Sequence, residues 1–168
     1  MNIAGIDIGL SKPTVIAFTN VREKIHRFVS VTGDAADVLS VIPPTVDLIA
    51  WERPYLNYNA EVFKRIAEFT AGLKIAAKLV RIETVEIPPA HWQEVIKKAF
   101  GLTSKPAGMT AQMWEDHKMR KFQQYLAGSV VTQFSDNWTT RKDEIAAACI
   151  ALHAMRRAKH QQNIGVWK

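Results

Sequence analysis

The stretch that decides the fold is residues 3–31, IAGIDIGLSKPTVIAFTNVREKIHRFVSV. It contains three runs of aliphatic and β-branched side chains, at residues 3–8, 14–18 and 25–31, and each run is typical of a β-strand. Residues 9–13, GLSKP, supply turn formers between the first two runs. The stretch therefore predicts three consecutive strands that form an antiparallel meander.

The rest of the chain alternates between helices and strands. We expect a short helix at residues 35–41, a strand covered on both faces at 46–51 and another strand at 83–87. Apolar residues recur at helical spacing over 59–80. Further helices are expected at residues 91–100, 111–126 and 141–159, with a polar loop at 101–110. This order predicts an α/β fold with a mixed central sheet of five strands.

Length and composition fit one globular domain over residues 1–168. With 48% apolar and 23% charged residues, the chain is able to bury a sizeable core, which excludes a disordered or collagen-like protein. Its one cysteine, Cys149, excludes an internal disulfide and a multi-cysteine zinc site, and it indicates a reducing compartment. No apolar run approaches about 18 residues, and no basic leader opens the sequence. We therefore expect a cytoplasmic protein with no membrane association.

Positive charge is concentrated in the C-terminal part of the chain. The net charge is +6, and residues 97–168 hold 12 of the 22 Lys and Arg residues but only 5 of the 16 Asp and Glu residues. A basic half on a small protein indicates a polyanionic partner, with nucleic acid as the first candidate. A solvated basic surface without a partner is the alternative that charge alone leaves open.

Three carboxylates stand where a folding argument would not place them. Asp7 interrupts the first apolar run, Glu52 ends the fourth strand, and Asp143 precedes the apolar run at 145–152. A carboxylate at the edge of a packed core is costly unless it is paired or binds a metal. If the first and fourth strands are neighbours and the last helix packs across their ends, the three groups converge. Oxygen ligands without His or Cys suit Mg²⁺ or Mn²⁺.

Each carboxylate also has a structural explanation that the sequence leaves open. Asp7 can mark a turn, and Glu52 can form an ion pair with Arg53. Thr140 and Asp143 have the spacing of a helix-capping box, with Asp in place of Glu. None of these roles requires a metal.

The three acidic segments resemble those of the RuvC-type Holliday junction resolvases of the RNase H-like superfamily. The matching segments are GIDIG at residues 5–9, IAWE at 49–52 and DEIAAA at 143–148. Residues 85–101 are similar to the middle segment of that family. The resemblance covers nearly the whole chain, and it implies an RNase H-like sheet flanked by helices in a bacteriophage member of the family. The implied activity is that of a structure-selective endonuclease that resolves four-way DNA junctions.

The resemblance implies that Asp7, Glu52 and Asp143 are catalytic metal ligands for two Mg²⁺ ions, with Mn²⁺ able to substitute. The family usually has a fourth acidic or histidine ligand three residues before the last aspartate, where this chain has Thr140. Glu144 lies within about 40° of Thr140 around a helix, so it is a candidate for the missing ligand, and a water molecule is the alternative. Two such ions would clamp the scissile phosphate and leave 5′ phosphates.

Basic and aromatic residues are candidates for DNA contacts. Lys118 resembles a lysine that the family places beside the scissile phosphate, although a solvated helix face explains it equally well. Tyr55 and Tyr58 follow Glu52, where the family places an aromatic that stacks at the open centre of the junction. Packing against the adjacent helix is the alternative for these tyrosines. The other expected DNA contacts are Lys97, Lys98, Arg120 and Lys121.

The helix at residues 59–80 carries an apolar stripe that covers more than half of its circumference. So broad a face can cover a sheet on one side and meet a second subunit on the other. Gly72, Ala76 and Ala77 would permit close helix approach. Because a four-way junction has near two-fold symmetry, the implied substrate favours a C₂ homodimer with two identical sites. Complete burial of this helix within the monomer is the alternative.

Three other functions share parts of this pattern. Another RNase H-like nuclease, acting on RNA–DNA hybrids or processing RNA as YqgF-like enzymes do, would have the same site but a different substrate. A non-catalytic junction-binding protein would account for Thr140. The segment at residues 5–9 also resembles the first phosphate loop of actin-like and sugar-kinase ATPases, but we find neither their second phosphate loop nor their adenosine motif.

Overall fold

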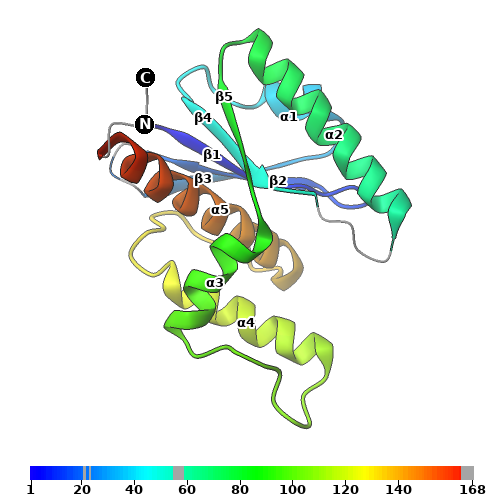
Figure 1. Ribbon diagram of the computed structural model, residues 1–168, viewed down its shortest axis with the longest axis vertical. Helices are drawn as coiled ribbons and strands as arrows, with labels where there is room; N and C mark the ends of the chain where they lie inside the picture. Colours follow the sequence, from blue (N-terminus) through cyan, green and yellow to red (C-terminus); the bar gives the residue numbers. More distant parts are fainter. Residues whose placement is uncertain (21, 23, 55–58, 164–168) are drawn as a thin grey trace.

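The computed structural model describes residues 1–20, 22, 24–54 and 59–163, with side chains as far as residue 161. Its elements, in chain order, are β1 (Ile3–Asp7), β2 (Thr14–Thr19), β3 (Ile25–Val31), α1 (Ala35–Ser40), β4 (Leu48–Glu52), α2 (Ala60–Leu79), β5 (Glu83–Ile87), α3 (Pro89–Ala99), α4 (Ala111–Tyr125) and α5 (Trp138–Asn163) (Figure 1).

The strands form one mixed sheet in the order β3-β2-β1-β4-β5. The pairs β1–β2 and β2–β3 are antiparallel, which confirms the predicted meander, whereas β1–β4 and β4–β5 are parallel. In the β1–β4 pair Ile6 lies opposite Trp51. The next residue on each strand is acidic, so Asp7 and Glu52 both end at the same edge of the sheet.

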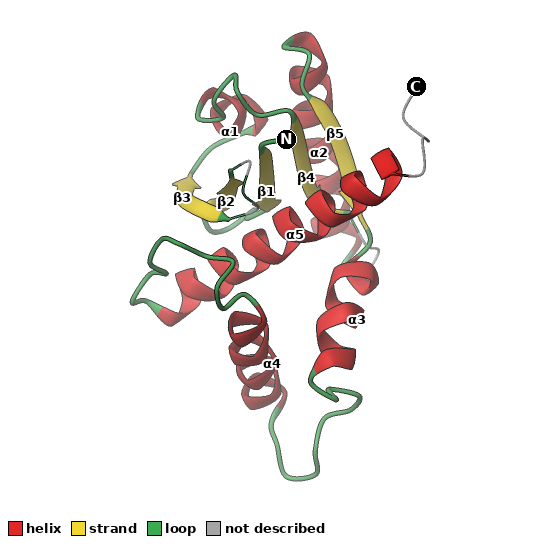
Figure 2. Ribbon diagram, turned by 90° about the vertical axis from the view of Figure 1, so that its left-hand side faces the viewer, coloured by secondary structure: helices red, strands yellow, loops and turns green. Residues whose placement is uncertain are grey.

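Helices cover both faces of the sheet, with α1 and α2 on one face and α5 across the other (Figures 1 and 2). Side chains alternate between the faces along each strand, as β geometry requires. Ile6 and Trp51 are buried on the face of α1 and α2, together with Leu73 of α2. Ile3 and Ala50 face the other way and pack into the cluster that contains α5. The core is therefore two apolar layers on either side of the sheet.

Helix α5 is in close contact with the sheet where it crosses β1 at Gly5. A Cβ atom on Gly5 would lie 2.5 Å from the backbone nitrogen of Ala151 and 2.6 Å from its Cβ. Only glycine fits at this distance, and the small side chains of Ala147 and Ala151 let the helix approach the strand. This crossing fixes the height of α5 along β1.

Helices α3 and α4 extend beyond the end of the sheet and are joined by the loop at residues 101–110 (Figures 1 and 2). They are attached to the core by Trp92 of α3 and Phe122 of α4, whose rings meet edge to face with centroids 5.6 Å apart. Each helix carries an exposed basic residue, Lys98 on α3 and Arg120 on α4. The basic half of the sequence is thus partly an extension of the molecule at one end of the sheet.

Several element boundaries differ from those expected. Helix α5 begins at Trp138, not at residue 141, because Asn137 caps it: its side-chain oxygen accepts hydrogen bonds from the N–H groups of Thr139 (2.9 Å) and Thr140 (3.1 Å). Helix α3 begins at Pro89, a residue suited to the first helical position because it has no N–H to satisfy. Within the described residues, no helix is both long and apolar enough to cross a membrane.

Substituting Gly5 with alanine tests the crossing of α5 and β1. The added methyl group overlaps the backbone of α5, so Gly5→Ala should lower the free energy of unfolding by about 3 kcal/mol, or roughly 10 °C in Tm. Gly72→Ala is the control, because its added Cβ would meet a single atom, Ala35 Cβ, at 3.3 Å, which needs a shift of only a few tenths of an ångström, and alanine favours helix by about 1 kcal/mol. Equal Tm values for the two variants in thermal denaturation would contradict the packing described here.

Candidate active site

The structure brings two of the three predicted carboxylates onto one common partner. Asp7 is the last residue of β1, and Asp143 lies in the second turn of α5. The ammonium group of Lys12 is 3.3 Å from Asp7 Oδ2, and it also donates a hydrogen bond to Asp143 Oδ1. Lys12 and Asp143, which are 131 positions apart in the sequence, therefore meet at the end of β1.

Lys12 is the site residue that the sequence analysis missed. It lies in the turn between β1 and β2, where the sequence indicated only turn chemistry. A signal was present, because a lysine five residues after a strand-terminal aspartate returns to that aspartate when the strands form a tight hairpin. The second contact, with Asp143, depends on the packing of α5 and is not readable from the sequence.

Glu52 joins the site from the neighbouring strand. Its Oε2 accepts a hydrogen bond of 3.0 Å from the indole N–H of Trp92, at the start of α3. Arg53 instead lies 3.8 Å from Glu86, so the predicted alternative of a Glu52–Arg53 ion pair is wrong. Trp92 orients Glu52 through its polar edge while its ring packs in the core.

The structural explanations for the two aspartates have different outcomes. Asp7 does mark the turn after β1, because it ends the strand and its Oδ2 accepts a hydrogen bond of 3.3 Å from Lys12 in that turn, which also contains a hydrogen bond of 3.2 Å from the N–H of Gly9 to the hydroxyl of Thr14. Asp143 is not part of a capping box, because the cap is Asn137 and Asp143 lies inside the helix. The predicted cap at Asp143 is therefore wrong, whereas Asp7 lies where the turn begins.

The electrostatics of the site are dominated by burial of negative charge. Burial, together with the charges of Asp143 and Glu52, raises the pKa of Asp7 to about 7, even though Lys12 acts in the opposite direction. Burial also raises the pKa of Glu52, and the indole of Trp92 offsets part of this shift. Burial lowers the pKa of Lys12, but the charges and hydrogen bonds of the two aspartates outweigh it, so its net shift is upward. The site therefore has three carboxyl groups, Asp7, Glu52 and Asp143, around the one ammonium group of Lys12.

The carboxylate oxygens of the site suit a hard divalent cation, although they are not grouped closely enough in this structure to surround one. Among the described residues, no three Asp, Glu, His or Cys side chains form a ready-made metal site. Two carboxylates nevertheless already hold one cation, the ammonium of Lys12, and Glu52 interacts with Asp7 through its charge. Carboxylate oxygens with no soft ligand are the set that Mg²⁺ or Mn²⁺ prefers. The ammonium of Lys12 is thus the cation that Asp7 and Asp143 hold in this structure.

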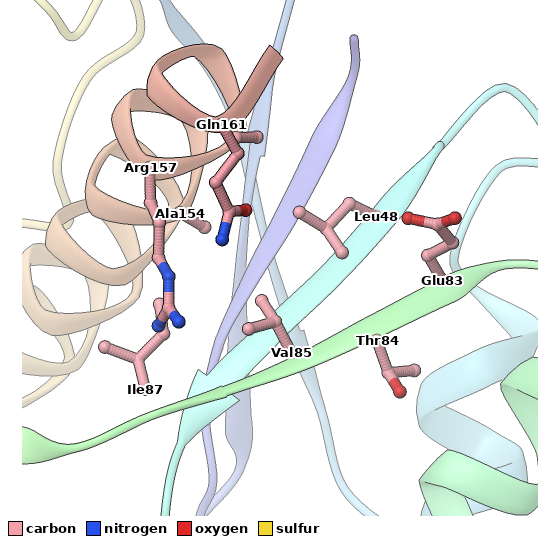
Figure 3. Close-up of a pocket in the computed structure, with 9 residues that line it drawn as sticks. Leu48, Glu83, Thr84, Val85, Ile87, Ala154, Arg157 and Gln161 are labelled. Carbon is pink, nitrogen blue, oxygen red and sulfur yellow. The ribbon is translucent and has the colours of Figure 1, made fainter. Parts of the chain in front are cut away.

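Two of the three carboxylates line a surface pocket. Asp7 and Glu52 line a pocket of about 400 Å³ whose wall includes Pro54 and Pro89 and the start of α2. A different cavity, of about 270 Å³, lies between β5 and the last turns of α5 and is lined by Leu48, Val85, Arg157 and Gln161, among others (Figure 3). That cavity contains none of the three carboxylates. The predicted carboxylates therefore lie at the carboxyl edge of the sheet and not in the cavity beneath α5.

Glu144, the predicted substitute for a fourth ligand, has another role. It is nearly buried, and its Oε2 accepts a hydrogen bond of 2.7 Å from the N–H of Ser135 in the segment before α5. This contact ties the helix to its leading loop. Thr140, in the first turn, directs its N–H to Asn137. The structure does not bring Glu144 to the contact of Asp7 with Lys12 and Asp143.

The predicted DNA contacts lie on α3 and α4, apart from Tyr55 and Tyr58, which fall outside the described residues. Lys118 is largely covered and lies 2.6 Å from Glu115 on the same helix. Arg120 stacks on Trp138, with 4.6 Å between its guanidinium carbon and the ring centroid. The remaining contacts are Lys97, which is half-buried, Lys98, which is exposed, and Lys121, which is half-buried. Within the described residues, no ion pair joins these basic groups to the three carboxylates.

The order of strands and the helices on both faces define an RNase H-like α/β fold. The structure is similar to that of Thermus thermophilus RuvC in complex with a Holliday junction substrate, with a TM-score of 0.64 and 15% identity over 95% of this chain and 96% of that one. It is also similar to Thermus thermophilus RuvC in a second structure, with a TM-score of 0.62, 17% identity and the same coverage. The yeast mitochondrial Holliday junction resolvase follows with a TM-score of 0.53 and 14% identity, over 96% of this chain and 83% of that one.

No protein-family model matches the sequence of the chain, and no curated protein matches it significantly. Identities of 14–17% over almost the whole chain show a shared fold. The predicted fold class is therefore confirmed.

The raised pKa of Asp7 predicts a pH-dependent stability of the metal-free protein. Because the folded pKa is about 7 and the ordinary value is 3.8, the folded state binds the proton more tightly, so this stabilisation is complete below pH 3.8 and is lost as the pH rises through 7. In EDTA, Asp7→Asn should raise Tm at pH 8, by about 2–4 °C for each kcal/mol gained, and should remove part of the stability that the wild type gains between pH 8 and pH 6. Asp136→Asn, on an exposed side chain, is the control. Identical profiles of Tm against pH for wild type and Asp7→Asn would show that the negative charge of Asp7 does not destabilise the folded state.

Proposed function

We propose that this protein is a structure-selective endonuclease that resolves four-way DNA junctions by metal-dependent hydrolysis. The observation that carries the proposal is the meeting of Asp7 and Asp143 on one cation, beside Glu52, at the carboxyl edge of the sheet. These are the three carboxylates on which the resemblance to RuvC-type resolvases rests. Similarity of fold to a RuvC bound to a Holliday junction substrate, over 95% of the chain, supports the same conclusion.

The cofactor of this reaction is proposed to be Mg²⁺, with Mn²⁺ able to substitute and two ions in each site. Asp7, Glu52 and Asp143 would hold the ions through their carboxylate oxygens. The chemistry that bound Mg²⁺ supplies in such a site is activation of a water molecule and stabilisation of the leaving 3′ oxygen, so the products carry 5′ phosphates. The fourth ligand is proposed to be a water molecule, because Glu144 is engaged by Ser135.

The chain's own residues prepare the site for a phosphate. The hydrogen bond from Trp92 restrains the carboxylate of Glu52. The exposed positive groups of α3 and α4 supply charge for the DNA backbone, as Lys98 does at the surface of α3. Arg120 lies on α4 and stacks on Trp138 at the start of α5. Asp116, which is also on α4, accepts a hydrogen bond from the indole of Trp138 and so connects the two helices.

The main alternative is an RNase H-like nuclease with another substrate, and a junction-binding protein without activity is the second. A single preparation assayed with Mg²⁺, Mn²⁺ or EDTA on a four-way DNA junction, an RNA–DNA hybrid and a linear duplex separates them. Selective cleavage of the four-way junction, in symmetric pairs of nicks, is the expected result. Selective cleavage of the hybrid would favour the first alternative, and binding without any cleavage the second.

Removing a carboxylate should abolish cleavage without abolishing binding. Asp7→Asn, Glu52→Gln and Asp143→Asn should each lower the rate of junction cleavage by more than about a hundredfold, because each removes a metal ligand. Junction binding in EDTA should be retained or strengthened, since a negative charge near the phosphate is lost. Glu83→Gln, at the opposite end of the sheet on β5, is the control and should cleave normally. Asp143→Asn with wild-type activity would refute the assignment of this residue.

The protein is proposed to be a homodimer that uses the outer face of α2. One side of this helix, including Leu73 and Ala77, is buried against the sheet. The other side leaves Ile75 and Leu79 exposed by 64% and 80%, so the predicted alternative of a completely buried helix is wrong. A second copy is the occupant that a two-fold substrate requires for paired nicking.

Charged substitutions on this outer face should separate the subunits. Ile75→Glu and Leu79→Glu should each convert a dimer into a folded monomer that makes single, unpaired nicks, as measured by sedimentation at micromolar concentration and by cleavage of an end-labelled junction. Val131→Glu is the matched control, since Val131 is also an exposed aliphatic residue (62%) but lies in the loop between α4 and α5, outside α2. A wild-type protein that sediments as a monomer would contradict the preformed dimer.

A further inference from the structure

Lys12 connects two carboxylates that the packing of α5 on β1 brings close together, and among the described residues it is the group that bonds to both. Its ammonium is 3.3 Å from Asp7 Oδ2 and is hydrogen-bonded to Asp143 Oδ1. Asp7 ends a strand and Asp143 lies on a helix on one face of the sheet, so their side chains come from separate elements. Without the positive charge of Lys12 between them, the negatively charged carboxylates of Asp7 and Asp143 would repel each other.

We propose that Lys12 is an internal counter-ion of the metal-free site, which a divalent metal must displace before the site is loaded. This inference rests on the proposed function, since it assigns the same carboxylates to the metal. The ammonium and the metal compete because both require the same oxygens: Mg²⁺ binds carboxylates at about 2.0–2.1 Å, which leaves no room for an ammonium between the same two groups. The positive charge of Lys12 would also repel a divalent ion held nearby.

The position of Lys12 allows this exchange. It belongs to the turn between β1 and β2, and its side chain is partly exposed, so its flexible stem can move toward solvent without disturbing the core. A backbone group or a buried arginine would have to be displaced together with its packing. Lys12 is therefore a positioning residue that keeps Asp7 and Asp143 in place without metal and lowers the affinity of the site for metal.

The decisive variant is Lys12→Met, which keeps the length of the side chain and removes its charge. At constant pH and ionic strength, its Mn²⁺ affinity, measured on the full chain by titration with electron paramagnetic resonance, should be at least about tenfold higher than that of the wild type. Its Tm in EDTA should be lower than that of the wild type, and its rise in Tm on addition of Mn²⁺ should be larger. Lys12→Gln is a second neutral variant, and Lys12→Arg, which keeps the charge, should bind Mn²⁺ as weakly as the wild type.

Lys64→Met is the matched control, because Lys64 pairs with Glu68 on α2 and touches none of the three carboxylates. It should leave Mn²⁺ affinity unchanged, which separates a local effect from a change in net charge. If both neutral variants of Lys12 bind Mn²⁺ no more tightly than the wild type, while Asp143→Asn abolishes Mn²⁺ binding, the counter-ion proposal is overturned and the proposed function stands. If neither the wild type nor any variant binds Mn²⁺ at millimolar concentration, the metal site itself is refuted, and both proposals fall.

Discussion

The close crossing of α5 over β1 at Gly5 is the constraint on which the rest of the structure depends. A single side-chain carbon at Gly5 would collide with Ala151, so the helix and the strand are held nearly in backbone contact. Residues 143, 147 and 151 are spaced by four and share one face of the helix. Residues 7, 5 and 3 likewise share one face of the strand. Seating Ala147 and Ala151 against Gly5 therefore brings Asp143 to Asp7, and the site is a direct consequence of this packing.

The sequence predicted the sheet well because its strands carry strong local signals. The runs at 25–31 and 83–87 coincide with β3 and β5, and the strand over 3–8 differs from β1 by one residue. The start of α5 was misplaced because the capping-box spacing of Thr140 and Asp143 competes with Asn137, and spacing alone does not show which side chain reaches the free N–H groups. Cap identity is decided by the path of the chain before the helix.

The carboxylates were predictable and their partners were not. Asp7, Glu52 and Asp143 each break an apolar pattern, which is a property of the local sequence. Lys12 and Trp92, which contact them, sit in a turn and on a helix where their residue types have ordinary explanations. Glu144 shows the converse: it was selected for its angular position on a helix, but the N–H of Ser135 binds its carboxylate. Helical angle specifies the face of a residue and not the group that its side chain meets.

Asp116 explains how the basic extension is aligned with the site. It lies on α4, and its Oδ1 accepts hydrogen bonds from the indole of Trp138 (3.0 Å) and from Lys142 (3.2 Å), both on α5. The hydrogen bond from Trp138, with those from Lys142 and Gln112, holds the pKa of Asp116 below its usual range, so the carboxylate stays ionised and keeps both partners. Lys142 directly precedes Asp143 in the chain. The helix that carries Arg120 is thereby anchored one residue away from a carboxylate of the site, which ties the basic surface and the acidic cluster to the same turn of α5.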